Sequence, residues 1–142
     1  MIINTEEELL EYGRKMAKRI ISREVTAGDG AIVIELVGDV GVGKTTLTRG
    51  LAEGLGVKEA VTSPSFTISK AYALPQGGRL VHYDFYRIGE PGLMAEDLAE
   101  NLADSQNVVV VEWGESVGDL LPEDRVMIRL EYDEDGGRRV VE

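Results

Sequence analysis

Helical and strand-like periodicity alternate along this chain from its first residues. Apolar positions recur at helical spacing up to Ile21, and Thr5 followed by Glu8 has the pattern of a capping box. Together these features predict an amphipathic helix from Thr5 to about Ser22. The next apolar run, residues 31–37, is rich in β-branched residues and has the length of a buried strand.

The remaining elements continue this alternation and end in extended segments. They are a helix with Leu47, Leu51 and Leu55 on one face and Gly56 as its C-cap, a hairpin of residues 66–74 and 79–88, a helix over residues 93–103, a buried strand over residues 108–111, and a second hairpin of residues 125–131 and 138–141. This order of signals predicts one α/β domain over residues 1–142. We expect a three-layer sandwich with a mixed, mostly parallel central sheet, to which the antiparallel hairpins are added.

The composition narrows the class of protein. A chain of 142 residues with 43% hydrophobic content can form one folded domain, and the lack of cysteine excludes disulfides and thiolate metal sites. The net charge of −11 argues against unaided tight binding of nucleic acid, which needs Lys and Arg against the phosphates. No secretory signal opens the chain, and its apolar runs are too short to span a bilayer. We therefore expect a cytoplasmic protein without membrane contact.

The strongest chemical signal is the stretch Gly38-Asp39-Val40-Gly41-Val42-Gly43-Lys44-Thr45, here called the glycine loop. It matches the P-loop pattern at every defined position and lies between a predicted strand and a predicted helix, as a triphosphate site requires. Glycines let backbone N–H groups curl around phosphate oxygens, and the following helix adds its positive end. We expect Lys44 to bind the β- and γ-phosphates and the Thr45 hydroxyl to bind Mg²⁺. The expected nucleotide contacts here are Gly38, Asp39, Val40, Gly41, Val42, Gly43, Lys44, Thr45 and Thr46.

Hydrolysis of a bound triphosphate also requires a carboxylate beside the metal, usually at the end of a neighbouring buried strand. Glu112 follows the four-valine strand, and Asp84 ends a more alternating one. The more buried strand favours Glu112 as the metal-side acid, with Asp84 holding a metal-bound water or orienting the attacking water. The residues alone leave open which of the two takes the metal-side role. The expected catalytic set is Lys44, Asp84 and Glu112.

Several further features have two interpretations each. Residues 62–67 are either an ordinary turn before a strand or a switch that closes over the γ-phosphate. His82, the only histidine, is predicted to be packed or hydrogen-bonded rather than catalytic. Trp113, the only tryptophan, is either a core ring or a contact for nucleotide or partner. Arg49 and Arg87 are either charge stabilisers or surface arginines.

Two absences in the sequence help to choose the nucleotide and the reaction. The chain has no Asn-Lys-x-Asp segment of the kind that reads guanine, which favours ATP over GTP. The stretch after Asp84 contains only Arg87 before Arg125, so it lacks the arginine-rich lid of a small-molecule kinase. We therefore expect phosphoryl transfer to water. The alternatives are a nucleotide-controlled interaction module in which hydrolysis is incidental, and a small-molecule kinase.

Four segments follow one another in a distinctive order. They are the glycine loop with its continuation to Gly50, the Ser-Pro-Ser-Phe-Thr segment, the string His82-Tyr83-Asp84-Phe85-Tyr86-Arg87, and Glu112-Trp113. Together they resemble the TsaE (YjeE) family of bacterial tRNA-modification ATPases. The resemblance extends from about Thr5 to Leu130.

This resemblance implies an ATPase that is needed to make threonylcarbamoyladenosine (t6A) in tRNA. Members of the family work with the TsaD–TsaB pair, and their hydrolysis of ATP is thought to reset that complex between turnovers. The implied roles are phosphate binding for Lys44, Mg²⁺ binding for Thr45 and Glu112, support of hydrolysis for Asp84, and an important contact for Trp113. Residues around Glu6 are implied to lie near the adenine. The tRNA would be held mainly by the partners, which agrees with the acidic net charge.

Overall fold

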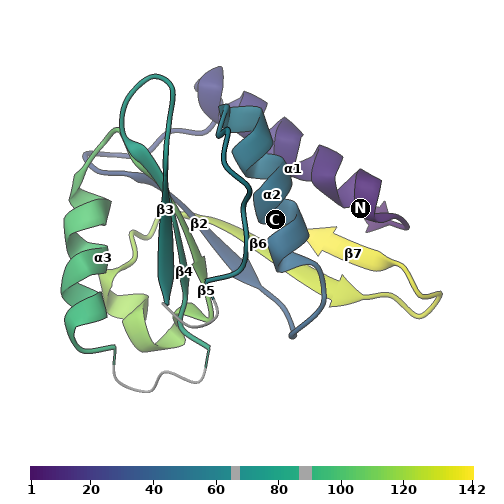
Figure 1. Ribbon diagram of the computed structural model, residues 1–142. Coiled ribbons are helices and arrows are strands. Elements are labelled where there is room, and N and C mark those ends of the chain that lie inside the picture. The colour runs from purple at the N-terminus through teal and green to yellow at the C-terminus, as the bar shows by residue number, and fades with distance from the viewer. Residues whose placement is uncertain (65–67, 87–90) are drawn as a thin grey trace.

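The computed structural model describes residues 1–64, 68–86 and 91–142 (Figure 1). Its elements are β1 (Ile2–Ile3), α1 (Glu6–Ile21), β2 (Ile32–Val37), α2 (Lys44–Leu55), β3 (Ser69–Ala73), β4 (Arg79–Asp84), α3 (Leu93–Ala103), β5 (Val108–Glu112), the 3₁₀ helix η1 (Gly114–Leu120), β6 (Val126–Tyr132) and β7 (Arg138–Val141). The strands form one seven-stranded sheet in the order β1-β7-β6-β2-β5-β4-β3. The glycine loop therefore follows the central strand of the sheet.

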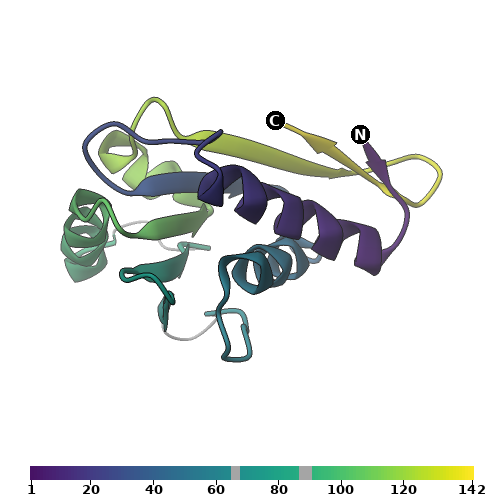
Figure 2. The same ribbon diagram turned by 90° about the horizontal axis from the view of Figure 1, so that it is seen from above.

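The sheet is parallel at its centre and antiparallel at both edges. β2 pairs in parallel with β5 and β6, and β4 pairs in parallel with β5. β3 adds to β4 and β7 adds to β6 as antiparallel hairpins. The predicted mixed sheet is thus confirmed. β1 was not predicted, and its two residues pair with β7 and bring the two ends of the chain together (Figure 2).

Helices cover both faces of the central strands, which gives the expected three layers. Alternate strand residues point to opposite faces, as the pleat requires. One face packs on α1 and α2, through Leu36, Leu80 and Val110 against Met16, Leu47 and Leu51. The other face packs on α3 and η1, through Val33, Val81 and Val109 against Leu98 and Val117. None of the helices within the described ranges is long and apolar enough to cross a membrane.

The helix boundaries follow the capping residues that the sequence carries. Thr5 is the N-cap of α1, and its hydroxyl oxygen accepts a hydrogen bond from the Glu8 N–H at 3.1 Å. Ser22 is the C-cap of the same helix. Gly56 ends α2 in the left-handed region, with φ of +91°. The predicted bounds of α3, residues 93 and 103, are also confirmed.

The first hairpin and the turn after β5 differ from the sequence prediction. β4 ends at Asp84 rather than at residue 88, because the Asp84 carboxylate accepts the N–H of Tyr86 at 2.9 Å and forms a local turn. Residues 66–67 and 87–88 of the predicted hairpin lie outside the described residues. The 3₁₀ helix η1 was not predicted, since a single short helix of this kind has no long periodic pattern.

Glycines let α1 and α2 approach until their backbones touch. A Cβ atom added to Gly50 would lie 2.1 Å from the carbonyl oxygen of Leu10, and one added to Gly13 would lie 2.3 Å from that of Leu47. Backbone atoms cannot yield as a flexible side chain does. We expect Gly50→Ala to lower the free energy of unfolding by about 2–3 kcal/mol, because forced overpacking outweighs the gain of about 1 kcal/mol in helix propensity.

Urea denaturation followed by circular dichroism measures this effect. Gly118→Ala is the matched control, because a Cβ atom there would meet nothing within 4 Å. We expect that control to stay within about 0.5 kcal/mol of wild type. Equal stability of the two variants would contradict the close helix contact.

Candidate functional site

The glycine loop connects the C-terminal end of β2 to the first turn of α2. Gly41 and Gly43 have φ of +81° and +118°, a region that L side chains rarely adopt. A Cβ atom on Gly38 would lie 2.6 Å from the carbonyl oxygen of Leu130. The loop thus follows a path that only glycines allow at these positions, and it presents the N-terminal end of α2 to one pocket.

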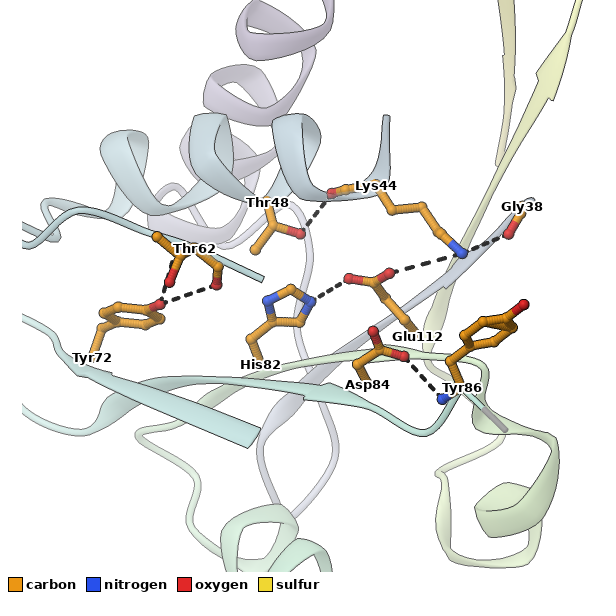
Figure 3. Close-up of polar contacts among 9 residues, drawn as sticks. All are labelled: Gly38, Lys44, Thr48, Thr62, Tyr72, His82, Asp84, Tyr86 and Glu112. Atoms are coloured by element: carbon orange, nitrogen blue, oxygen red, sulfur yellow. Dashed lines mark hydrogen bonds and ion pairs between the residues drawn. The ribbon is translucent and has the colours of Figure 1, made fainter. Parts of the chain in front are cut away.

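Lys44 extends from the first turn of α2 towards Gly38 and Glu112 (Figure 3), and its side chain is buried. Its Nζ donates to the carbonyl oxygen of Gly38 at 2.5 Å and lies 3.8 Å from Oε1 of Glu112. The same nitrogen lies 4.1 Å from the centre of the Trp113 ring. Burial lowers the pKa of Lys44, and the nearby carboxylates of Glu112 and Asp84 act against this shift. A buried cation with room beside it is well suited to bind an anionic ligand.

Asp84 and Glu112 are direct neighbours at the ends of two parallel strands. All five residues of β5 are buried, which confirms the buried strand that the valine run predicted. Glu112 belongs to the strand next to β2, whereas Asp84 lies one strand further away. Burial raises the pKa of the Asp84 carboxyl, and the hydrogen bond from the Tyr86 N–H partly offsets this. Both acids are on the face of the sheet that α2 covers.

These groups surround a pocket of about 270 Å³. Among its lining residues are Lys44, Thr45, Ser63, Asp84, Glu112 and Trp113. The predicted residues Val40 and Gly41 also line it. The tertiary structure therefore brings together residues from the glycine loop, from the segment before β3, and from the ends of β4 and β5.

Other predicted contacts lie elsewhere. Glu6 pairs with Arg49 at 2.9 Å, and Arg49 also donates to the hydroxyl of Thr46 at 3.2 Å. None of these three residues lines the pocket. Gly38, Asp39 and Val42 line a neighbouring pocket of about 260 Å³, which Trp113 shares. Arg49 is thus a partly exposed, ion-paired residue in the middle of α2, as its surface interpretation predicts.

Two of the sequence expectations fall where the structure gives no description. Residues 65–67 of the expected switch lie outside the described residues, and so does Arg87. Ser63, at the start of that segment, does line the pocket. Trp113 is partly buried and has φ of +55°, and its ring lies 4.8 Å from that of Tyr86. It therefore serves as a wall of the pocket as well as a packed ring.

The structure also adds residues that sequence reasoning missed. Arg138 on β7 donates from Nε to the carbonyl oxygen of Val42 at 2.7 Å and so anchors the glycine loop. Tyr86 joins the pocket wall beside Trp113. The contact of Arg138 spans 96 positions of the chain. No local pattern in the sequence indicates such a contact.

The donor set of the pocket suits a hard cation that is bound together with a phosphate. The hydroxyl of Thr45 and the carboxylates of Asp84 and Glu112 supply oxygen only, which Mg²⁺ prefers, and Mg²⁺ keeps several waters and phosphate oxygens as further ligands. In the described part of the chain, no group of three or more His, Cys, Asp or Glu side chains could hold a metal ion alone. The residues thus fit a metal that arrives with a nucleotide.

Comparison with known proteins places this chain among relatives of known family. The tRNA threonylcarbamoyladenosine biosynthesis protein TsaE of Streptomyces coelicolor is 46% identical over 122 residues, which cover 85% of this chain and 77% of that protein. The protein of the same name from Haemophilus influenzae is 31% identical over 133 residues, covering 94% of this chain and 82% of that protein.

A solved structure and a family model agree with these relatives. The crystal structure of Bacillus subtilis YdiB matches with a TM-score of 0.73 and 31% identity, covering 99% of this chain and 80% of the YdiB chain. The family model described as threonylcarbamoyl adenosine biosynthesis protein TsaE matches residues 3–140. These residues include the glycine loop, both acids and Trp113, and the chain therefore belongs to the TsaE family.

Proposed function

We propose that this protein binds ATP with Mg²⁺ and hydrolyses it to support the formation of t6A in tRNA. The observation that carries this proposal is the convergence of Lys44, Thr45, Asp84 and Glu112 on one pocket at the N-terminal end of α2. A cation, backbone N–H groups and oxygen donors for a metal are the parts that phosphoryl transfer requires. Membership of the TsaE family supports t6A formation as the process in which this chemistry is used.

Each residue of the chain has a defined task in this proposal. The Lys44 Nζ leaves the Gly38 carbonyl and binds the β- and γ-phosphates, aided by the N–H groups of the glycine loop. Thr45 and Glu112 hold Mg²⁺, which neutralises charge on the phosphates when it is bound. Asp84 orients the attacking water. Its raised pKa makes this carboxylate a better proton acceptor than an exposed one.

The proposal also includes partners. The net charge of −11 leaves little attraction for RNA, so the tRNA is held by TsaD and TsaB and this protein acts on that complex in the cytoplasm. Of the described residues that line the pocket, none is an arginine. We therefore expect hydrolysis to be slow in isolation and faster in the complex, where a partner can supply a positive charge or order the pocket.

The decisive experiment measures t6A formation by TsaD–TsaB with and without this protein, together with ATP hydrolysis in each mixture. We expect several turnovers of t6A only when the protein and ATP are present. The same yield without the protein would contradict the proposal. Multiple turnovers with a variant that binds ATP but cannot hydrolyse it would favour the interaction module, and a phosphorylated small molecule in a metabolite screen would favour the kinase.

A further inference from the structure

His82 is a fully buried polar side chain beneath the candidate site. It lies on β4, two residues before Asp84, and its side chain is on the face of the sheet that α2 covers. Its backbone pairs in register with Val110, two residues before Glu112 on β5. Because side chains two residues apart share a face of the sheet, His82 points to the same layer as both acids. It does not line the pocket itself.

Among the described residues, the Glu112 carboxylate is the one hydrogen-bond partner of the His82 imidazole. Its Nε2 makes a short contact with Oε2 of Glu112 (Figure 3). Its Nδ1 is buried and has no hydrogen-bond partner in the described part of the chain. A buried acceptor without a partner is unfavourable, and an apolar residue would avoid that cost. Packing alone therefore gives no reason for a histidine at this position, whereas the contact with Glu112 does.

That contact divides the two oxygens of Glu112 between different tasks. Oε2 is held by His82, while Oε1 faces the pocket and lies 3.8 Å from the Lys44 Nζ. This distance is too long for a hydrogen bond. A carboxylate without the histidine would be free to rotate onto the buried ammonium group and form a close ion pair with it. Such a pair would occupy both the lysine and the acid that the nucleotide site needs.

We propose that His82 is a positioning residue, which holds Glu112 through Nε2–H and so keeps Oε1 directed at the pocket and Lys44 available for phosphate. This inference rests on the proposed function, because it assigns Glu112 to the Mg²⁺ that accompanies the nucleotide. The imidazole lies behind Glu112, outside the pocket lining, and touches no reacting atom. Its contribution is to fix the orientation of a metal ligand, as outer hydrogen-bond partners do at other metal sites.

The amide side chains of Gln and Asn provide a matched pair of variants. The Gln amide nitrogen reaches about as far from the backbone as Nε2 of histidine, whereas the Asn amide nitrogen is one carbon shorter. His82→Gln thus keeps a donor for Glu112, and His82→Asn removes it with a similar change in polarity. Tyr83→Phe is the control on the same strand, since it removes the hydrogen bond that Tyr83 donates to Asp97 and the one it accepts from Asn101, both on the opposite face.

The measurement is the affinity for the non-hydrolysable analogue AMP-PNP, determined by calorimetry with Mg²⁺ and again with EDTA. The quantity compared is the ratio of the AMP-PNP affinity with Mg²⁺ to that with EDTA. We expect this ratio to be about tenfold smaller in His82→Asn than in wild type, and to stay within about threefold of wild type in His82→Gln. Tyr83→Phe should lower the thermal midpoint but keep the full Mg²⁺ effect. Adding His82→Asn to Glu112→Gln should cause no further loss, because the two residues act as a unit.

Two results would overturn the inference while leaving the proposed function intact. One is a wild-type Mg²⁺ effect in His82→Asn, and the other is an equal loss in the Asn and Gln variants, which would indicate a packing role only. A wild-type protein whose AMP-PNP affinity does not depend on Mg²⁺ would instead refute the metal role of Glu112 and the inference with it. The wild-type titration therefore separates the two failures.

Discussion

Replacing Lys44 by alanine is expected to weaken ATP binding by about 30-fold or more, because truncating one partner of a desolvated charge pair costs about 2–5 kcal/mol. The Lys44 side chain is 5% exposed, and its Nζ is the only cation among the described residues that line the pocket. Burial lowers the pKa of this ammonium group. Bound phosphates would replace the hydration that it has lost, so much of the binding energy depends on this one side chain.

Calorimetric titration with AMP-PNP and Mg²⁺ tests this expectation. Lys58→Ala is the matched control. Lys58 is exposed beyond the end of α2, so this substitution removes the same charge at a position away from the pocket. We expect the control to bind as wild type does. Wild-type affinity in Lys44→Ala would show that the glycine loop does not hold phosphate in the proposed way.

The second large effect is expected on turnover. Glu112→Gln should lower the rate of ATP hydrolysis by about 100-fold or more, the usual scale for removing one preorganised charge from a catalytic site. Glutamine keeps the shape of the side chain but removes the negative charge that faces Mg²⁺ and Lys44. Nucleotide binding should persist within about tenfold, because Lys44 and the glycine loop remain.

Single-turnover hydrolysis in the presence of TsaD–TsaB and tRNA measures this rate. Asp84→Asn is the companion variant, and Glu100→Gln on α3 is the control, since Glu100 is exposed and lines neither this pocket nor its neighbour. A larger shift in the Mg²⁺ requirement for Glu112→Gln than for Asp84→Asn would identify Glu112 as the metal-side acid. If both variants hydrolysed ATP at the wild-type rate, neither carboxylate would have the proposed role.

Local signals in the sequence were strong enough to predict most elements of the fold. The helix after Thr5, the buried strand at residues 108–111 and the helix at residues 93–103 were all predicted, and the structure confirms them. Each depends on neighbouring residues, since caps and periodicity act within one or two turns. The predicted start of β4 at Arg79 is confirmed, but its predicted C-terminal end was wrong, because the turn that Asp84 forms with Tyr86 competes with strand pairing.

The sequence by itself also determined the chemistry that is available. The order of strand, glycine loop and helix, with Lys44 and Thr45 at the helix start, is a local property of consecutive residues. The nature of Asp84 and Glu112 as acids at strand ends is local as well. What they contact is not, because it depends on which strands become neighbours in the sheet.

Only the tertiary structure decided how these groups are arranged. The parallel pairing of β4 with β5 places Asp84 beside Glu112, and the position of β5 next to β2 brings Glu112 towards Lys44. The tertiary structure also brings His82 to Glu112, which is 30 positions away in the chain, and Arg138 to Val42 of the glycine loop, which is 96 positions away. Such contacts arise from strand order and register, which no local pattern encodes. The physical reason is that burial and pairing are properties of the whole sheet, whereas caps, turns and the glycine loop are properties of a few adjacent residues.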